Sequence, residues 1–287
     1  MVSKRILVVG GSSFIGKNLL EQMPQDWKIV ATYCKNKNFE NFCKKFSHIE
    51  AVQFDVTDEN GGVPTGSFDT VVYIAANSDP RKSLEDPVND LAVNAGGVAR
   101  VLQEVKCKKF IYFSSGAVYL KEDIPYTISK KAGEAYAQWY AKENGIQYVI
   151  VRLFEAFGPY SPERKIFRKL CEAVDRGETT FTIYGDGKNL VDPMYVEDTA
   201  KGILSIINSS KGNVIVDLCT GKPMSITEVA KAIAKIYKVD LQLSYEGEAV
   251  EQVFFKGNPA GMKKYFDFSP SISFEEGIKK WQKRKLE

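Results

Sequence analysis

Histidine is nearly absent from the sequence and cysteine is sparse. The 287 residues include one histidine, His48, and five cysteines, which form no Cys-x-x-Cys pair. Because metal sites gather several such ligands at short spacings, we expect no metal centre. An odd number of scattered cysteines also argues against a disulfide framework. The cysteines are therefore interpreted as free thiols of a protein in a reducing compartment, the cytoplasm.

The chain also lacks a strong charge of one sign and a long apolar run. Its 39 basic and 36 acidic residues give a formal net charge of +3, which provides no field for binding nucleic acid. No stretch reaches the ~20 apolar residues that a membrane-spanning helix needs. The apolar run at 6–9 ends in glycines and is interpreted as a first strand rather than a leader. A globular protein without nucleic-acid or membrane partners is expected.

Apolar, β-branched runs alternate with helical patterns through the first half of the chain. Such runs are typical of parallel strands that are covered on both faces. The alternation predicts an α/β fold with a Rossmann-type, doubly wound parallel sheet, which binds ligands at the carboxyl ends of its strands. The expected strands are 6–9, 29–33, 51–54, 71–75, 110–114 and 148–153, and the expected helices are 15–23, 88–105 and 127–144.

The pattern changes near Gly158 and Pro159, where the elements become shorter. Residues 1–158 are expected to form an NAD(P)-binding Rossmann domain. Residues 159–287 are expected to form mainly a smaller α+β lobe that binds the substrate. Within this second part, about 188–218 are expected to return to the Rossmann domain.

A glycine-rich segment, GGSSFIG at 10–16, follows the first strand and opens a helix. Gly10 permits a tight turn, and Gly16 lets the helix approach the sheet closely. A helix start of this kind presents unpaired N–H groups to a diphosphate, so the segment predicts a dinucleotide site. Ser13 occupies a place where glycine is common, and its side chain either points away from the diphosphate or binds it.

The end of the second strand informs the choice of cofactor. NAD sites usually carry an acid there to bind the ribose hydroxyls. This chain has Thr32 and Tyr33, followed by Lys35, and no acid. The cofactor is therefore expected to be NAD or NADP, with NADP slightly preferred, unless the lysines are only solvated loop charges. Asp55 follows the third strand and either accepts a hydrogen bond from the adenine amino group or caps the strand end.

Tyr126 and Lys130 are four residues apart and so lie on one face of a helix. Tyrosine has a reference pKa near 10 and needs a nearby cation to exchange a proton at neutral pH. The ammonium of Lys130 and an oxidised nicotinamide would supply that charge. Ser115, at the end of the fifth strand, is placed to hydrogen-bond the same substrate oxygen. The three residues together predict hydride-transfer chemistry at a carbonyl or an alcohol.

These motifs together make the sequence similar to the extended short-chain dehydrogenases/reductases of the NAD-dependent epimerase/dehydratase family, which act mostly on nucleotide sugars. Further landmarks are FSSGAVY at 113–119, RLFEAFGP at 152–159 and GDGKNLVDPMYVEDTA at 185–200. The resemblance implies a catalytic triad of Ser115, Tyr126 and Lys130. It also implies substrate contacts at Asn77 and Gly116. The cofactor residues that it implies are Gly10, Ser13, Phe14, Ile15, Gly16, Asp55, Val56, Ala75, Ala76 and Asn94, besides Lys130.

Some positions depart from the pattern of that family. Gly116 and Ala117 follow Ser115 where the 4,6-dehydratases carry an Asp-Glu pair, which argues against dehydration. Glu155 stands near the substrate in place of an asparagine, and its charge would repel a diphosphate unless it points elsewhere or is protonated. Val191 replaces an arginine that usually binds the diphosphate. The substrate is then either a nucleotide sugar held differently or a different molecule.

An aromatic stripe, Tyr136, Trp139 and Tyr140, lies on the expected helix 127–144. Core packing is the favoured interpretation. The alternative is a homodimer through the helices at 88–105 and 127–144, which the family resemblance implies.

The function expected from the sequence is an NAD(P)-dependent nucleotide-sugar epimerase that transiently oxidises and re-reduces a sugar hydroxyl, with Tyr126 as acid and base. One alternative is an NADPH-dependent ketoreductase of a sugar nucleotide or another small carbonyl compound. Another is a catalytically silent nucleotide-sensing or scaffold protein, which is disfavoured because both Tyr126 and Lys130 are present.

Overall fold

A computed structural model describes residues 3–120, 123–248 and 256–286. The chain forms two compact units. The first contains residues 1–153 and 203–216, and the second contains residues 154–202 and 217–287. Among the residues described, no helix is both long and apolar enough to cross a bilayer.

The first unit is built on a seven-stranded sheet in the order β11-β6-β5-β4-β1-β2-β3. The pairings from β3 to β6 are parallel, with Leu7 opposite Val30 and Val8 opposite Val72. The expected doubly wound parallel sheet is therefore confirmed. The strand order reverses between β1 and β4, and ligands of such sheets bind where this reversal occurs. The strands are β1 Arg5–Val9, β2 Lys28–Tyr33, β3 Ile49–Gln53, β4 Ser67–Tyr73, β5 Lys106–Ser115, β6 Gln147–Leu153 and β11 Val214–Leu218.

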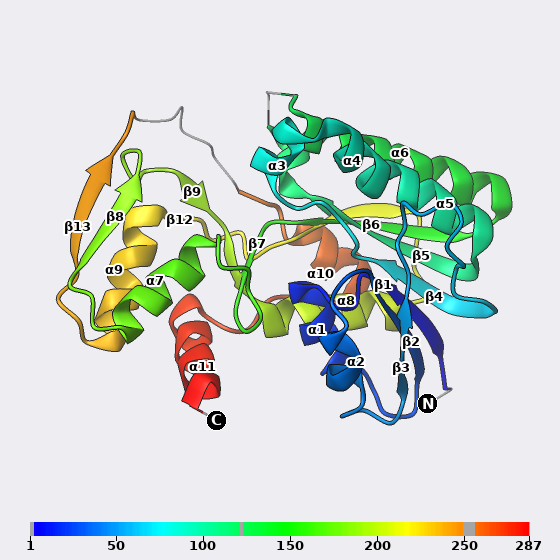
Figure 1. Ribbon diagram of the computed structural model, residues 1–287, viewed down its shortest axis with the longest axis horizontal. Helices are drawn as coiled ribbons and strands as arrows, with labels where there is room; N and C mark the ends of the chain where they lie inside the picture. The colour runs from blue at the N-terminus through cyan, green and yellow to red at the C-terminus, as the bar shows by residue number, and fades with distance from the viewer. Residues whose placement is uncertain (1–2, 121–122, 249–255, 287) are drawn as a thin grey trace. The chain divides into compact units, whose positions relative to one another are not determined.

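Helices cover both faces of this sheet (Figure 1). One face carries α1 Phe14–Leu20 and α2 Asn38–Cys43. The other carries α3 Pro80–Glu85, α4 Pro87–Leu91, a π-helical turn at Ala92–Gly96, α5 Gly97–Glu104 and α6 Pro125–Asn144. The helix expected at 88–105 is thus divided by one wide turn.

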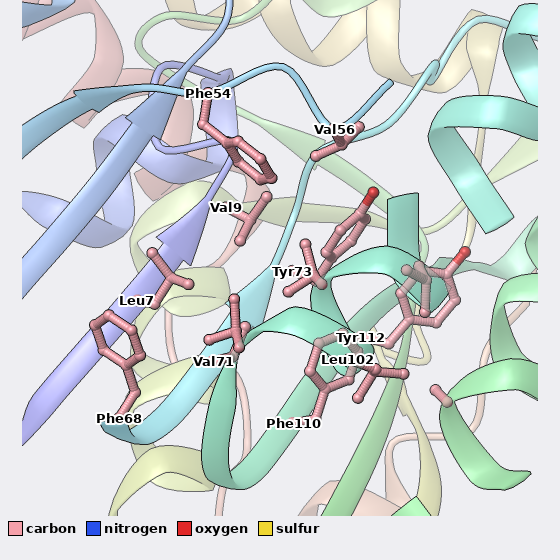
Figure 2. Close-up of a cluster of buried hydrophobic side chains, with 14 of the residues drawn as sticks. Leu7, Val9, Phe54, Val56, Phe68, Val71, Tyr73, Leu102, Phe110 and Tyr112 are labelled. Carbon is pink, nitrogen blue, oxygen red and sulfur yellow. The ribbon is translucent and has the colours of Figure 1, made fainter. Parts of the chain in front are cut away.

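The core of the first unit lies between the sheet and the helices α5 and α6. Alternate residues of each strand point to this side, as the pleat of a strand requires. Figure 2 shows this cluster, with the hydroxyl groups of Tyr73 and Tyr112 at its edge. Its buried members include Leu7, Val9, Phe54, Val56, Phe68, Val71, Tyr73, Leu102, Phe110 and Tyr112.

The two tyrosine hydroxyls of this core hold the π-helical turn. Tyr73 donates to the carbonyl of Val93 at 2.8 Å, and Tyr112 donates to the carbonyl of Asn94 at 3.0 Å. Gly133 of α6 lies against the same turn, because a Cβ there would be 2.4 Å from the Tyr112 hydroxyl. A turn of this type is frequent at functional sites, and here it places Asn94 beside α6.

The second unit combines short strand pairs with helices. β7 Glu155–Phe157 pairs in parallel with β10 Pro193–Tyr195, and β8 Thr180–Tyr184 pairs in parallel with β13 Gln242–Glu246. β9 Leu190–Val191 and β12 Met224–Ser225 are antiparallel. Its helices are α7 Ile166–Asp175, α9 Ile226–Tyr237, α10 Ala260–Phe266 and α11 Phe274–Leu286, and α8 Val196–Asn208 belongs partly to each unit.

Core packing explains only part of the aromatic stripe on α6. Tyr140 packs against the first core. Tyr136 and Trp139 are 48% and 58% exposed, so core packing is wrong for these two residues. The physical reason is their position on α6, whose opposite side already fills the space against the sheet.

Candidate active site

The glycine-rich loop lies between β1 and α1, at the point where the sheet reverses its order. Gly10 has a φ of +88°, and a Cβ at this residue would lie 2.6 Å from the backbone nitrogen of Ala75. A Cβ on Gly16 would lie 2.5 Å from the carbonyl oxygen of Gly11. Both positions therefore require glycine, because neighbouring backbone atoms occupy the space that a side chain would need.

Two hydroxyl side chains support this loop from within. The Thr32 Oγ1 accepts from the N–H of Gly10 at 3.0 Å, and Thr32 itself is buried. The Ser13 Oγ accepts from the N–H of Gly16 at 3.1 Å and thereby caps α1, so Ser13 turns toward its own helix. Phe14 and Ile15 form the first turn of that helix.

The carboxyl end of β2 is close to an acid that the local sequence does not reveal. Tyr33 is buried, and its hydroxyl donates to the carboxylate of Glu40, which is supplied by α2. Phe39 precedes Glu40 and packs on the glycine loop, because a Cβ on Gly11 would lie 3.1 Å from its ring. Lys35 is exposed beside them. An acidic side chain, Glu40, and a basic one, Lys35, therefore both lie near the carboxyl end of β2.

Asp55 serves as a cap at the end of β3. One carboxylate oxygen accepts from the N–H and hydroxyl of Thr57 at 2.9 and 2.7 Å, and the other accepts from the Cys34 thiol at 3.0 Å. These hydrogen bonds, with that of Cys34 the largest cause, lower the pKa of Asp55. Val56 is buried under Gly97, where an added Cβ would be 2.8 Å from it. The Asp55 carboxylate therefore holds the turn that follows β3.

The segment after β4 runs beside the glycine loop. The N–H of Ala75 donates to the carbonyl of Val9 at 2.9 Å. Ala76 and Asn77 follow and are partly exposed. The Asn77 amide donates to Asp90 at 2.9 Å.

The residues of the proposed triad come from β5 and α6. Tyr126 lies in the first turn of α6, and its N–H donates to the Ser83 hydroxyl of α3 at 3.2 Å. Lys130 lies one turn later, and its ammonium donates to the carbonyl of Phe113 at 2.9 Å. Phe113 precedes Ser115 by two residues on the same strand, so the lysine holds this face of α6 to the end of β5. Gly116 is buried at the start of a 3₁₀ turn, Gly116–Tyr119, where the Ser115 Oγ accepts from the N–H of Ala117 at 3.1 Å.

Burial and charge act in opposite directions on Lys130. Its side chain is 2% exposed, and this burial lowers the pKa of the amine to about 8. The carboxylates of Asp90 and Glu134 act against the burial and favour the ammonium. The charge of Lys130 therefore depends on two acids that lie outside the triad.

Three residues that support the triad were not found from the sequence. Glu134 follows Lys130 by four residues, and this spacing on one helix face could have identified it. It accepts from the Ser114 hydroxyl at 2.6 Å and from the Arg152 guanidinium at 2.9 and 2.7 Å. Asp90 is fully buried, and an acid within an otherwise apolar helix pattern was its only local signal.

In the second unit, the charge of Glu155 is compensated. Its carboxylate accepts from the ammonium of Lys165 at 2.8 Å, and both side chains are partly buried. Val191 pairs with Met224 across the β9–β12 ladder and packs against the second core. The negative charge of Glu155 is therefore balanced by Lys165, and Val191 is an apolar packing residue.

Asn94 tests whether this site fits a dinucleotide. The residue is fully buried, and its amide nitrogen lies within hydrogen-bond distance of three acceptors, the Asn77 carbonyl, Asp90 and Ser129. Its Oδ1 is also buried and has no hydrogen-bond partner within the described part of the chain. A buried acceptor without a donor is unfavourable, so this atom fits a hydroxyl of a bound molecule. Together with the glycine loop that leads into the N-terminus of α1, the residues present fit a dinucleotide cofactor.

Comparisons with known proteins agree with this arrangement. Residues 6–218 match the model of the NAD dependent epimerase/dehydratase family. The chain is 27% identical to a putative UDP-glucose 4-epimerase of Methanocaldococcus jannaschii, over 97% of this chain and 98% of that protein. It is also 27% identical to a UDP-glucuronate 4-epimerase of Thermodesulfobacterium geofontis, over 98% and 97%. The structure of UDP-glucuronic acid 4-epimerase from Bacillus cereus, in complex with UDP-glucuronic acid and NAD, superposes with a TM-score of 0.85 at 20% identity, over 99% and 100%.

Proposed function

Because the chain belongs to the NAD-dependent epimerase/dehydratase family and is an enzyme of the extended short-chain dehydrogenase/reductase type, we propose that it epimerises a nucleotide sugar, with Tyr126 as acid and base. One observation carries this proposal. The ammonium of Lys130 binds the carbonyl of Phe113 at 2.9 Å, one helical turn beyond Tyr126 and two residues before Ser115. A proton-exchanging phenol, a buried cation and a hydroxyl donor therefore come from two elements that are fixed to each other.

The bound dinucleotide supplies the acceptor of a hydride and later its donor. Its holders in this proposal are the loop of Gly10 to Gly16, the segment at Ala75 and Ala76, and Asn94. Tyr126 would accept the proton of the sugar hydroxyl when the alcohol is oxidised, and it would return the proton to the same oxygen when the ketone is reduced. Lys130 stabilises the phenolate, and Ser115 donates to the sugar oxygen.

We propose a UDP-sugar as substrate, with the reaction at C4. The relatives named above are described as acting on UDP-glucose or UDP-glucuronate. Within this chain, Lys165 neutralises Glu155, which removes the charge that would otherwise repel a diphosphate. The acid at position 155 is therefore compatible with a nucleotide sugar.

For the cofactor we propose NAD. The carboxylate of Glu40 lies at the Tyr33 hydroxyl, where it would repel a 2′-phosphate and accept from ribose hydroxyls. The sequence slightly favours NADP because no acid directly follows the second strand. In the structure, α2 supplies an acid, Glu40, beside the end of that strand. NADP stays the alternative that the exposed Lys35 and Lys37 favour.

We also propose a homodimer through α4 and α6. Val88 and Leu91 are 78% and 51% exposed on α4, and Tyr136 and Trp139 are exposed on α6. The two helices pack against each other. Their exposed apolar side chains suit a second copy of the same face.

Two measurements test the proposed function. The purified protein is heat-denatured, and any released nucleotide is identified by chromatography and mass spectrometry. The protein is then incubated with UDP-glucose and with UDP-glucuronate, and the C4 epimers are followed by proton NMR. Retained NAD together with interconversion of one pair supports the proposal. An empty protein that consumes NADPH with a keto-sugar nucleotide establishes the ketoreductase instead, and no reaction with either class overturns the proposal.

A further inference from the structure

A carboxylate lies buried beneath the proposed site and has no role in the triad. Asp90 of α4 is 0% exposed. One of its oxygens accepts from the amides of Asn77 and Asn94 at 2.9 and 3.1 Å. The other accepts from the Ser129 hydroxyl at 2.5 Å. Asp90 therefore connects the end of β4, the π-helical turn and α6.

The partners of Asp90 are neutral, so they do not balance its charge. Burial of an uncompensated carboxylate costs several kcal/mol. The buried cation in this region is Lys130, which follows Ser129 directly in α6, and the electrostatic effect of Asp90 on it opposes the effect of burial. The Asp90 carboxylate and the Lys130 ammonium are thus both withdrawn from water, and the negative charge of Asp90 favours the charged form of Lys130.

Asp90 also determines the orientation of Asn94. The amide nitrogen of Asn94 faces the carboxylate, whereas the reversed amide would place its oxygen against a negative charge. In the same orientation, the amide nitrogen of Asn94 also donates to the Ser129 Oγ at 3.0 Å. The amide oxygen is consequently the acceptor of this side chain that lacks a donor within the described structure.

We propose that Asp90 is a positioning residue of the reaction, which keeps Lys130 charged and turns Asn94 so that its amide oxygen can accept from the bound cofactor. This inference rests on the proposed function, because it assigns Lys130 and Asn94 the roles described there. The charged and titratable groups around Lys130 are Tyr126 and Glu134 of α6, Tyr112 of β5, whose ring centre is 5.2 Å from the ammonium, and Asp90.

Binding of the cofactor as a function of pH tests the role of Asp90. The affinity for NADH is measured by fluorescence titration from pH 6 to 10 for the purified protein freed of nucleotide. The pKa of Lys130 is lowered by burial to about 8, so affinity is expected to fall above this pH. In Asp90→Asn the midpoint of this fall moves to lower pH, by about one unit or more, because the opposing anion is lost. A purely structural role would weaken binding equally at all pH values.

The matched control is Asp86→Asn, which removes an exposed carboxylate at the start of the same helix. Its midpoint should equal that of the unchanged protein. A folded Asp90→Asn protein with an unshifted midpoint overturns the inference. If that variant fails to fold, Ser129→Ala is used instead. It removes one hydrogen-bond donor to Asp90 and leaves the charge of the carboxylate, so the pH midpoint should not move to lower pH. A midpoint at lower pH would contradict the role of the charge. These titrations need no sugar substrate. Their result therefore tests the role of Asp90 even if the protein shows no epimerase activity.

Discussion

The Nε and Nη2 groups of Arg152 donate to the two carboxylate oxygens of Glu134, at 2.9 and 2.7 Å. The glutamate lies two helical turns after Tyr126, and the arginine lies near the carboxyl end of β6. Since Glu134 also accepts from the Ser114 hydroxyl of β5, one buried carboxylate fixes α6 to two neighbouring strands. The orientation of the face of α6 that carries Tyr126 and Lys130 therefore depends on this ion pair.

Loss of this pair should destabilise the first unit strongly. Glu134→Gln leaves the guanidinium of Arg152 largely buried without its anion, which costs about 3 kcal/mol of unfolding free energy. Urea unfolding followed by circular dichroism measures this loss. Asp267→Asn, which breaks an exposed pair with Lys263, is the control and should leave the midpoint unchanged. An equally small effect of both variants would show that the buried pair does not hold α6.

Removal of the Tyr126 hydroxyl should separate catalysis from binding. In Tyr126→Phe, turnover should fall at least about 100-fold, because the proton of the sugar hydroxyl has no acceptor. The affinity for NADH should stay nearly the same. Tyr136→Phe removes a hydroxyl from an exposed position of the same helix and should leave turnover unchanged. Lys130→Met should weaken both turnover and cofactor binding. Unchanged turnover in Tyr126→Phe would refute the role of the phenol.

The cofactor preference should depend on Glu40. Glu40→Lys replaces the carboxylate at the Tyr33 hydroxyl by a cation, so the ratio of NADPH to NADH affinity should rise about tenfold. Titrations of the nucleotide-free protein with both cofactors measure the ratio. Asp26→Lys makes the same change of net charge before the start of β2 and should leave the ratio as it was. A tighter binding of NADPH by the unchanged protein would contradict the proposed use of NAD.

The Glu155–Lys165 pair should determine how the substrate diphosphate is tolerated. Lys165→Met exposes the diphosphate to the charge of Glu155, so the KM for the UDP-sugar should rise about tenfold with little change in kcat. Lys165→Arg should restore the KM, and Lys169→Met, one turn along α7, should have no effect. Steady-state kinetics with the UDP-sugar that is converted in the proton NMR assay measures these values. An unchanged KM in Lys165→Met would place Glu155 away from the diphosphate.

Local patterns predicted the sheet, the glycine loop and the helix face of Tyr126 and Lys130. Each of these features is determined by residues that are neighbours in the sequence. Gly10, for example, directly follows the buried strand β1. The supporting charges were not predictable in this way. Glu40, Lys165 and Asp90 act on residues in other elements, and Asp90 meets Ser129 from 39 residues away. The π-helical turn was missed because the hydroxyls of Tyr73 and Tyr112 that hold it come from two separate strands.

The exposed apolar side chains of α3, α4 and α6 predict self-association. Leu84, Val88, Leu91, Ile128, Tyr136 and Trp139 are each between 48% and 78% exposed on helices that pack against one another. Burial of such side chains in a symmetric interface contributes about 25 cal/mol per Å² of apolar surface. Light scattering after size-exclusion chromatography should give a dimer for the unchanged protein and a monomer for Trp139→Lys. Tyr184→Lys changes an aromatic residue that is 80% exposed on β8 and should leave the dimer intact. A monomeric unchanged protein would exclude this interface, and dissociation of both variants would assign the association to exposed aromatic residues in general.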